Sequence, residues 1–358
     1  MAEALVQQFA DTIRAAADAK RPLRIRGGGS KAFYGNASAS DDLNVTLLDV
    51  APYRGIINYE PTELVITACA GTPLVEIESA MRERGQMLGF EPPHFGGGAT
   101  LGGCIAAGLS GPRRPYAGSV RDFVLGVRML DGRGSDLAFG GQVMKNVAGY
   151  DVSRLITGSL GTLGVILEVS LKALPLPPAE LTLCREQSRS DAIATMNAWA
   201  GQPLPVTGTC HVEKRLYVRL AGAASAVKAA AQKIGGEEVV NAAEFWRNVR
   251  DHRDVFFGGV RPIWRISLPP TAPEFNLTGP QLVEWNGALR WLKSDDDAMA
   301  VREAARKADG HATLFRRGNP EIGAFHPLPE TMMRLHKRVK QAMDPAGILN
   351  PGRMYPDL

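Results

Sequence analysis

Hydrophobic and polar positions in residues 1–175 follow two periods, one typical of helices and one typical of strands. Leu5, Phe9 and Ile13 recur at helical spacing, which predicts an opening amphipathic helix that ends before residue 21. A second helix is predicted to begin with Thr72 as its N-cap, and a third at residues 151–157. Strands are predicted, from apolar runs bounded by turn residues, at 23–26, 45–48, 55–59, 64–68, 124–130 and, as a long alternating strand, 165–174.

The pattern changes after the proline-rich stretch at residues 174–178, which predicts a domain boundary. All five tryptophans lie between residues 179 and 329, and glycine becomes less frequent there. The alternation of helices and strands predicts an α+β domain with an antiparallel sheet and helices on one face. These helices and strands are expected at 190–200, 216–220, 224–234, 261–268 and 297–309, with a final helix at 329–343.

Two glycine-rich segments lie in the first third of the chain, Arg26-Gly27-Gly28-Gly29-Ser30 and residues 91–114. Glycine allows positive φ angles and lets backbone N–H groups approach a ligand without a Cβ in the way. Successive N–H groups that face one way form an anion-binding nest. Two such segments, each beside a strand, favour a long ligand with a central diphosphate, such as a flavin dinucleotide.

The first segment also fits the dinucleotide fingerprint of a Rossmann fold, since Gly27, Gly29 and Ala32 follow a strand. Asp49 follows about twenty residues later, where that motif places an acid. The motif requires its glycines to open an amphipathic helix. Residues 30–42 show no helical period and are interrupted by a glycine, so we reject the Rossmann interpretation.

Composition and charge exclude several classes of function. The 358 residues are 45% apolar and 22% charged, which is typical of a soluble globular protein with room for two domains. A net charge of +4 without a basic run argues against nucleic acid, and no transmembrane helix or signal peptide is evident. No metal is expected, because the isolated cysteines form no ligand set and are interpreted as small buried hydrophobes in a reducing cytoplasm. They are Cys69, Cys104, Cys184 and Cys210.

The order of the motifs resembles the vanillyl-alcohol oxidase/p-cresol methylhydroxylase (PCMH) family of FAD-linked oxidases, and within it the FAD-binding subunits of bacterial glycolate oxidase. The resemblance covers nearly the whole chain. It rests on the R-G-G-G-S loop, the segment from Ala99 to Val127, K-N-V-A-G-Y-D-V from Lys145, G-S-L-G-T-L-G-V-I from Gly158 and the terminal D-P-A-G-I-L-N-P-G-R-M-Y-P. It implies an α+β fold with a PCMH-type FAD-binding domain at 1–175 (subdomains of about 1–55 and 56–175), a cap domain at 179–329 and a C-terminal segment at 330–358 that returns to the FAD-binding domain.

The same resemblance implies which residues bind FAD. In similar proteins the two glycine segments hold the diphosphate, and the region after Gly158 packs against adenosine and flavin. Some relatives attach the flavin through a histidine in the first loop, but Ser30 stands there, and neither His94 nor Cys104 lies in a suitable pattern. We therefore expect non-covalent FAD. The expected FAD-binding residues are Arg26, Gly27, Gly28, Gly29, Ser30, Gly35, Gly97, Thr100, Gly102, Gly103, Gly108, Ser119, Gly158, Thr162, Gly164 and Ile166.

Candidate catalytic residues follow from the chemistry of 2-hydroxy acid oxidation. That reaction needs a cation for the carboxylate, preferably arginine, and a base for the hydroxyl proton, usually histidine. The sister subunits of catalytic type carry a G-D-G-N-x-H motif, which is absent here; the nearest stretch is Asp309-Gly310-His311. The candidates are Arg114, Arg265, His311 and Arg316, with Arg261 as a further cation.

Three functions therefore stay open. The resemblance implies a redox subunit of a glycolate oxidase (glycolate dehydrogenase) complex, which oxidises glycolate or a similar 2-hydroxy acid such as D-lactate. Its partners would be a second FAD subunit and an iron–sulfur subunit that receives the electrons. The alternatives are a self-sufficient FAD-linked oxidase or dehydrogenase with its own substrate site, and a structural flavoprotein subunit. We expect the chain in the cytoplasm, with membrane contact only through its partners.

Overall fold

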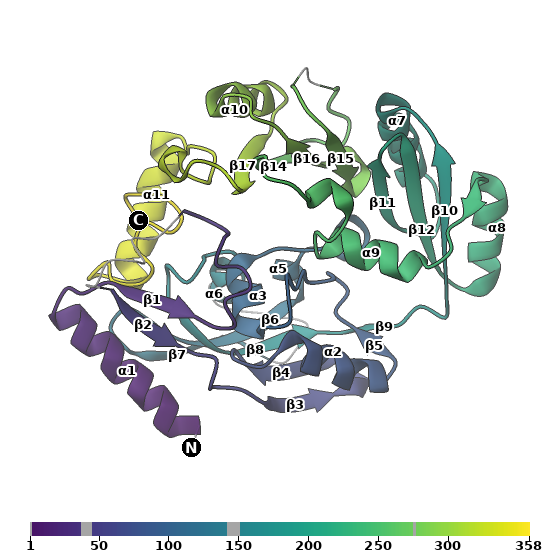
Figure 1. Ribbon diagram of the computed structural model, residues 1–358. Coiled ribbons are helices and arrows are strands. Elements are labelled where there is room, and N and C mark those ends of the chain that lie inside the picture. Colours follow the sequence, from purple (N-terminus) through teal and green to yellow (C-terminus); the bar gives the residue numbers. More distant parts are fainter. Residues whose placement is uncertain (1, 37–44, 142–150, 275–276) are drawn as a thin grey trace.

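The chain begins with a helix packed on a small parallel sheet (Figure 1). Phe9 and Ile13 lie on the buried face of α1 (Ala2–Asp18), against β1 (Leu23–Arg26) and β2 (Thr46–Asp49). The helix and both strands are confirmed where the sequence predicts them. The computed structural model describes residues 2–36, 45–141, 151–274 and 277–358, so residues 145–150 of the K-N-V-A-G-Y-D-V motif lie outside the described residues.

A five-stranded antiparallel sheet forms the centre of the first half, in the order β3-β4-β8-β6-β7. The helices α2 (Leu74–Glu83) and α3 (Leu101–Ala107) share a hydrophobic core with this sheet. The strands are β3 (Ile56–Glu60), β4 (Val65–Cys69), β6 (Val124–Leu130), β7 (Asp136–Gly140) and β8 (Val165–Lys172). Shorter elements are α4 (Arg114–Ala117), α5 (Val120–Phe123) and α6 (Val152–Ile156), with β5 (Gln86–Met87) paired to β9 (Leu174–Pro175).

Two sequence-based expectations for this half are wrong in detail. β8 is buried on both faces instead of alternating, because Ile166 packs into the core with α2 and α3 while Val165 packs into the core with α1. Thr72 does not cap α2. Its hydroxyl instead exchanges hydrogen bonds with the backbone of Gly55, at 2.9 and 3.1 Å, and α2 starts at Leu74.

The second half of the chain forms an eight-stranded antiparallel sheet, in the order β13-β10-β12-β11-β15-β16-β14-β17 (Figure 1). The helices α7 (Arg189–Ala200), α8 (Ala224–Ile234) and α10 (Ala298–Lys307) pack on one face, as predicted. The helix α9 (Ala242–Arg250), which the sequence did not indicate, covers part of the other face, which is turned toward the first half. The strands are β10 (Ala179–Glu186), β11 (Val206–Val212), β12 (Arg215–Gly222), β13 (Glu237–Glu238), β14 (Ile263–Ser267), β15 (Gln281–Glu284), β16 (Leu289–Lys293) and β17 (His311–Arg316).

The C-terminal segment returns to the first half of the chain (Figure 1). α11 (Glu330–Met343) carries Lys340, whose buried ammonium donates hydrogen bonds to the carbonyl of Thr162 at 2.8 Å and to Asp344 at 2.7 Å. Beyond the helix, the N–H of Leu23 in β1 donates to the carbonyl of Ile348 at 2.7 Å. Among the helices of the described part, none combines the length and the hydrophobicity that a bilayer crossing requires.

Candidate functional site

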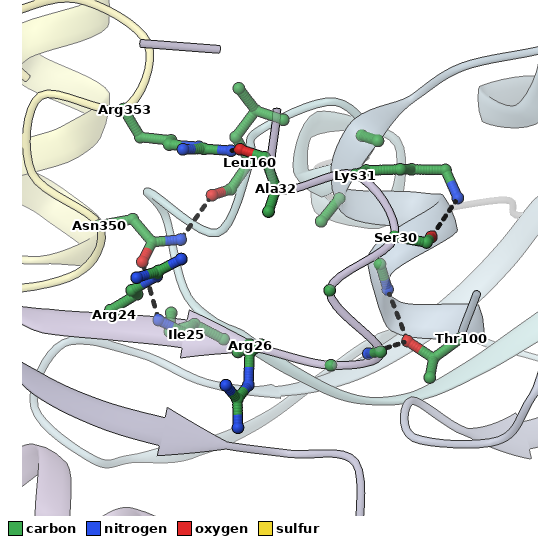
Figure 2. A pocket seen from close by; sticks show the side chains of 16 residues that line it. Arg24, Ile25, Arg26, Ser30, Lys31, Ala32, Thr100, Leu160, Asn350 and Arg353 are labelled. Atoms are coloured by element: carbon green, nitrogen blue, oxygen red, sulfur yellow. Dashed lines mark hydrogen bonds between the residues drawn. The ribbon is translucent and has the colours of Figure 1, made fainter. Parts of the chain in front are cut away.

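The two glycine-rich segments meet beside the end of β1 and frame one cavity, which we call the cradle (Figure 2). The backbones of Gly28 and Gly98 approach so closely that a Cβ on Gly28 would overlap the carbonyl oxygen of Gly98. Thr100 caps the N-terminus of α3, and its Oγ1 accepts from the N–H groups of Gly28 and Gly103, both at 3.4 Å. The contact between the segments therefore requires glycine at position 28.

The charge of the cradle favours an anion. Arg24, Arg26, Lys31 and Arg353 line it, and none of the described residues that line it is acidic (Figure 2). Burial lowers the pKa of Lys31 from its ordinary value. Arg26 is paired with Asp49 and Arg353 donates to loop carbonyls, whereas Arg24 and Lys31 form no ion pair with a described residue. These cations, the backbone N–H groups and the hydroxyl of Ser30 fit a bound diphosphate.

Residues from the C-terminal segment hold the first glycine loop in place. The guanidinium of Arg353 donates to the carbonyls of Tyr34 and Asn36, at 2.7 and 3.0 Å. Asn350 accepts from the N–H of Ile25 at 2.8 Å and donates to the carbonyl of Leu160 at 2.7 Å (Figure 2). Sequence reasoning gave no site role to these two side chains, although both belong to the terminal motif N-P-G-R.

The predicted FAD-binding residues divide into two groups in the structure. One group lines the cradle, and the other does not. The first group consists of Arg26, Gly27, Gly28, Gly29, Ser30, Thr100 and Gly103. The second consists of Gly35, Gly97, Gly102, Gly108, Ser119, Gly158, Thr162, Gly164 and Ile166.

Several glycines of the second group are required by close packing. A Cβ on Gly102 would lie 2.7 Å from the Cβ of Ala70, and a Cβ on Gly108 would lie 2.8 Å from the Cα of Gly158. A Cβ on Gly164 would overlap the side chain of Met129. These glycines let secondary structure elements approach each other, which is a role that the sequence alone does not separate from ligand binding.

Other members of the second group have local structural roles. Ser119 forms a capping box with Asp122 at the start of α5. Thr162 donates to the carbonyl of Ser159 at 2.7 Å, which fixes the turn before β8. Ile166 lies in the core.

The local structure also bears on the rejected Rossmann interpretation. β1 and β2 do pair in parallel, as two strands of a Rossmann unit would. However, residues 30–36, the described start of their connection, form turns and bends and no helix. Asp49, which the fingerprint would place on a ribose, is paired with Arg26 at 3.1 Å.

A second cavity lies between the second glycine segment and the eight-stranded sheet; we call it the interface cavity. Strand alternation places Arg265, Glu284 and Trp291 on the face of the sheet that lines it. The indole Nε1 of Trp291 donates to Oε2 of Glu284 at 2.8 Å. The guanidinium of Arg265 lies over the ring of Trp285, 5.3 Å from its centroid.

Two titratable groups of the interface cavity have shifted pKa values. Burial raises the pKa of Glu284 to about 7, despite the hydrogen bond from Trp291 and the charge of Arg265. Burial, together with nearby arginine charges, holds the pKa of His252 well below its ordinary value. A carboxyl group that titrates near neutral pH can exchange a proton with a ligand. The sequence did not lead to a prediction for Glu284. The feature that could have indicated it is a single acidic residue within the apolar run Leu282-Val283-Glu284-Trp285.

The predicted catalytic residues do not share one cavity. Arg265 lines the interface cavity, whereas Arg114 lies over Trp285 at 4.4 Å and lines a neighbouring groove. Arg316 lies over the ring of Phe33 at 3.9 Å, and burial beside another arginine lowers its pKa to about 10.

The remaining two candidates lie outside both cavities. His311 begins the edge strand β17 and is exposed. Arg261 is also exposed and is paired with Asp295 at 3.1 Å. The structure therefore brings Arg265 and Arg114 together at Trp285. It places His311 outside both cavities but on the same face of the sheet as Arg265, and burial and the charge of Arg265 lower the pKa of His311.

The position of His311 predicts that it contributes little to cofactor binding. Replacing it with alanine is expected to leave the flavin content of the purified chain unchanged, because the side chain lines neither cavity. The measurement is the ratio of flavin to protein absorbance in the variant and the parent chain. A loss of flavin would show that this edge of the sheet supports the cofactor.

The cysteines agree with their interpretation as buried hydrophobes. All four thiols are free and buried. Burial raises the pKa of Cys104 to about 12. His94 is also buried, with Nε2 3.2 Å from a carboxylate oxygen of Glu78. In the part of the chain that the structure describes, no three or more His, Cys, Asp or Glu side chains are grouped as metal ligands.

Comparisons with known proteins identify relatives of this chain. A family of FAD binding domains matches residues 4–140. The glycolate oxidase subunit GlcE of Escherichia coli is 51% identical over 352 residues, which are 98% of both chains. The glycolate oxidase subunit GlcD of Bacillus subtilis is 30% identical over 173 residues, 48% of this chain and 36% of that protein. A D-2-hydroxyglutarate dehydrogenase of Xanthomonas citri is 30% identical over 47% of this chain and 35% of its own length.

The fold has relatives among solved structures. Alkyldihydroxyacetonephosphate synthase superimposes with a TM-score of 0.67 at 14% sequence identity, over 96% of this chain and 75% of the synthase. At that identity the match concerns the fold alone, and it extends over both halves of the chain.

Proposed function

This chain belongs to the family of FAD-linked oxidoreductases that includes the glycolate oxidase subunit GlcE, and we propose that it is the corresponding FAD-binding subunit of a glycolate-oxidising complex. The observation that carries the proposal is the 51% identity over 98% of both chains. FAD is the cofactor of this oxidoreductase, and when bound it supplies the two-electron acceptor.

The cradle is the proposed site of the FAD diphosphate. The cations and glycine N–H groups that line it suit the negative charges of two phosphates. Because Gly28 and Gly98 have no side chains and lie in close contact, the phosphates would meet backbone N–H groups directly. We propose that FAD is held without a covalent bond, because no histidine or cysteine is among the described residues that line the cradle. On this proposal, residues 1–175 form the FAD-binding domain, 179–329 the cap, and 330–358 a segment that fixes the first loop.

The proposed substrate is glycolate or a similar 2-hydroxy acid such as D-lactate. GlcE and GlcD are named as glycolate oxidase subunits, and the dehydrogenase of Xanthomonas citri is named for D-2-hydroxyglutarate. A chain of this kind would work in the cytoplasm beside a second FAD subunit and an iron–sulfur subunit that receives the electrons. The four cysteines of this chain are separate buried thiols, so the clusters would belong to the partner.

A second candidate function is a self-sufficient FAD-linked oxidase or dehydrogenase. The observation that favours it is the interface cavity, which Arg265 and Glu284 line with a cation and a titratable carboxyl group. A purely structural flavoprotein subunit has no such observation in its favour.

The test of the proposed function is the anaerobic visible spectrum of the purified chain before and after addition of glycolate or D-lactate. Bleaching in the isolated chain would favour the self-sufficient enzyme. A flavin that stays oxidised until the partner subunits are added would favour the subunit of a complex. A flavin that neither acid reduces, even in the assembled complex, would refute the proposed substrate class.

A further inference from the structure

The interface cavity brings together a cation and a carboxyl group from two strands of the large sheet. Arg265 in β14 is paired with Trp291 in β16, and Trp291 is paired in turn with Leu282 in β15. Glu284 lies two residues after Leu282, so its side chain is on the same face of the sheet as those of Arg265 and Trp291. Both groups line the cavity, together with Gly111 of the second glycine segment.

Both side chains have hydrogen-bonding capacity that the protein does not use. Within the described residues, the guanidinium of Arg265 makes no hydrogen bond and no ion pair; its contact is with the ring of Trp285. Glu284 is 4% exposed and uses Oε2 to accept from Trp291, while its Oε1 has no partner in the described chain. Neither of these groups is among the fully buried unpaired atoms of the described chain, so both are open to the cavity and can bind a ligand there.

The walls of the cavity restrict the size of that ligand. The side chains of Phe95, Leu109 and Phe315 line it beside the two polar groups. A Cβ on Gly111 would overlap the carbonyl oxygen of Glu91, so this wall is fixed by backbone contact. A polar ligand of few atoms, with its charge at one end, fits such a site.

We propose that Arg265 and Glu284 form a subsite for a short 2-hydroxy carboxylate, in which Arg265 binds the carboxylate and Glu284 accepts the proton of the hydroxyl group. The inference rests on the proposed function for the identity of the substrate. In the oxidation, the O–H and C–H bonds of the substrate break and a C=O bond forms. The proton goes to Glu284, and the carbon-bound hydrogen leaves with its electron pair to the oxidised FAD, which gives the 2-oxo acid. The base is then a glutamate of the large sheet and not His311.

The surroundings of Glu284 support this role. Its pKa, raised to about 7 by burial, lies where proton transfer at neutral pH is efficient. An entering anion meets the least repulsion when the carboxyl group is protonated, whereas accepting the hydroxyl proton requires the carboxylate, and a pKa of about 7 leaves both forms populated at neutral pH. The titratable and charged groups that face it are Arg265 in β14, Cys210 in β11, Arg219 in β12, Glu91 before α3, and Arg250 and His252 at the end of α9.

These neighbours leave Glu284 as the group that changes charge near neutral pH. Burial raises the pKa of Cys210 well above its ordinary value, so it remains a thiol. Arginine charges hold the pKa of Glu91 below its ordinary value against the effect of burial. The lowered pKa of His252 keeps its ring neutral.

Binding of oxalate to the full FAD-loaded chain tests the subsite without turnover, because oxalate has no hydroxyl group to oxidise. Fluorescence of Trp285 and Trp291, which contact the two polar groups, reports the dissociation constant. We expect binding to weaken by about tenfold or more between about pH 6 and about pH 8.5, as Glu284 loses its proton. Glu284→Gln should abolish this pH dependence, and Arg265→Met should weaken binding at every pH.

Glu274→Gln is the matched control for the oxalate titrations. Glu274 is an exposed carboxylate in the same half of the chain, paired with Arg189 at 2.8 Å and outside the interface cavity. Its variant should bind oxalate with the pH dependence of the parent. A parent chain whose oxalate binding does not change with pH would overturn the inference.

Flavin reduction by glycolate, followed anaerobically in the assembled complex, is the second readout. Glu284→Gln should lower the rate by about 100-fold or more without raising the concentration for half-saturation, and Glu284→Asp should restore part of the rate. An unchanged rate and pH profile in Glu284→Gln would also overturn the inference. If oxalate binds as expected but no 2-hydroxy acid reduces the flavin, the anion-binding site stands, while the proposed substrate and the role of Glu284 as its base fail.

Discussion

Replacing Gly28 with valine is expected to leave the chain folded but to weaken FAD binding by about 100-fold or more. A Cβ at this position would overlap the carbonyl oxygen of Gly98, so the two glycine segments must move apart. Their separation would also break the contacts of Thr100 Oγ1 with the N–H groups of Gly28 and Gly103. The N–H groups that face the cradle would then no longer converge on one anion.

The measurement is the flavin content of the purified Gly28→Val chain, followed by titration of the stripped protein with FAD. Gly201→Val is a matched control: Gly201 has a negative φ of −83°, and the nearest atom to its Cβ would be 3.8 Å away. Circular dichroism of both variants separates cofactor loss from unfolding. A Gly28→Val chain that retains full FAD content would show that the diphosphate binds elsewhere.

Gly102 illustrates why the sequence could not predict the whole cradle. A Cβ there would meet the side chain of Ala70, where α3 packs near the end of β4, and not the space of the cradle. Loss of flavin after substitution at Gly102 would therefore follow from repacking of the core. A backbone that closely approaches a ligand requires glycine, and so does a backbone that closely approaches another backbone. The sequence alone therefore does not distinguish the two roles.

Local patterns predicted the elements whose determinants are close in sequence. The apolar period of α1 and the turn residues that flank β3, β4 and β6 are properties of short segments, and these elements form where they were expected. The role of Arg353 is of another kind, because its carbonyl partner at Asn36 is 317 residues away. Such contacts depend on how the C-terminal segment returns to the first loop, which no local period encodes.

Glu284 shows the same limit at the candidate substrate site. Its burial and its neighbours arise from the pairing of β15 with β16 and β11, and from the position of the second glycine segment against that face. The sequence offered a stronger local signal at His311, which the structure places at an exposed strand edge. A lone acid within an apolar strand is a signal of this kind of site only when the pairing of the strands is known.

Replacing Glu284 with glutamine is expected to stabilise the folded chain at alkaline pH and to leave its stability at acidic pH nearly unchanged. Burial raises the pKa of Glu284 in the folded chain from 4.5 to about 7. Between these values the folded chain holds a proton that the unfolded chain releases, so the free energy of unfolding falls as the pH rises through this window. The parent therefore loses on the order of 3 kcal/mol by about pH 8.5, a loss that glutamine, which has no charge to bury, does not suffer.

The measurement is the free energy of unfolding of the FAD-saturated parent and Glu284→Gln chains at about pH 5 and about pH 8.5. Other titrating groups are common to both chains and cancel in the comparison. Glu274→Gln, at an exposed carboxylate, should show no such difference between the two pH values. A Glu284→Gln chain that is no more stable than the parent at the higher pH would mean that the carboxyl group is ionised at little cost, and so could not act as a base that titrates near neutrality. A gain in stability together with a loss of flavin reduction would show that the chain keeps a destabilising residue because its proton chemistry is needed.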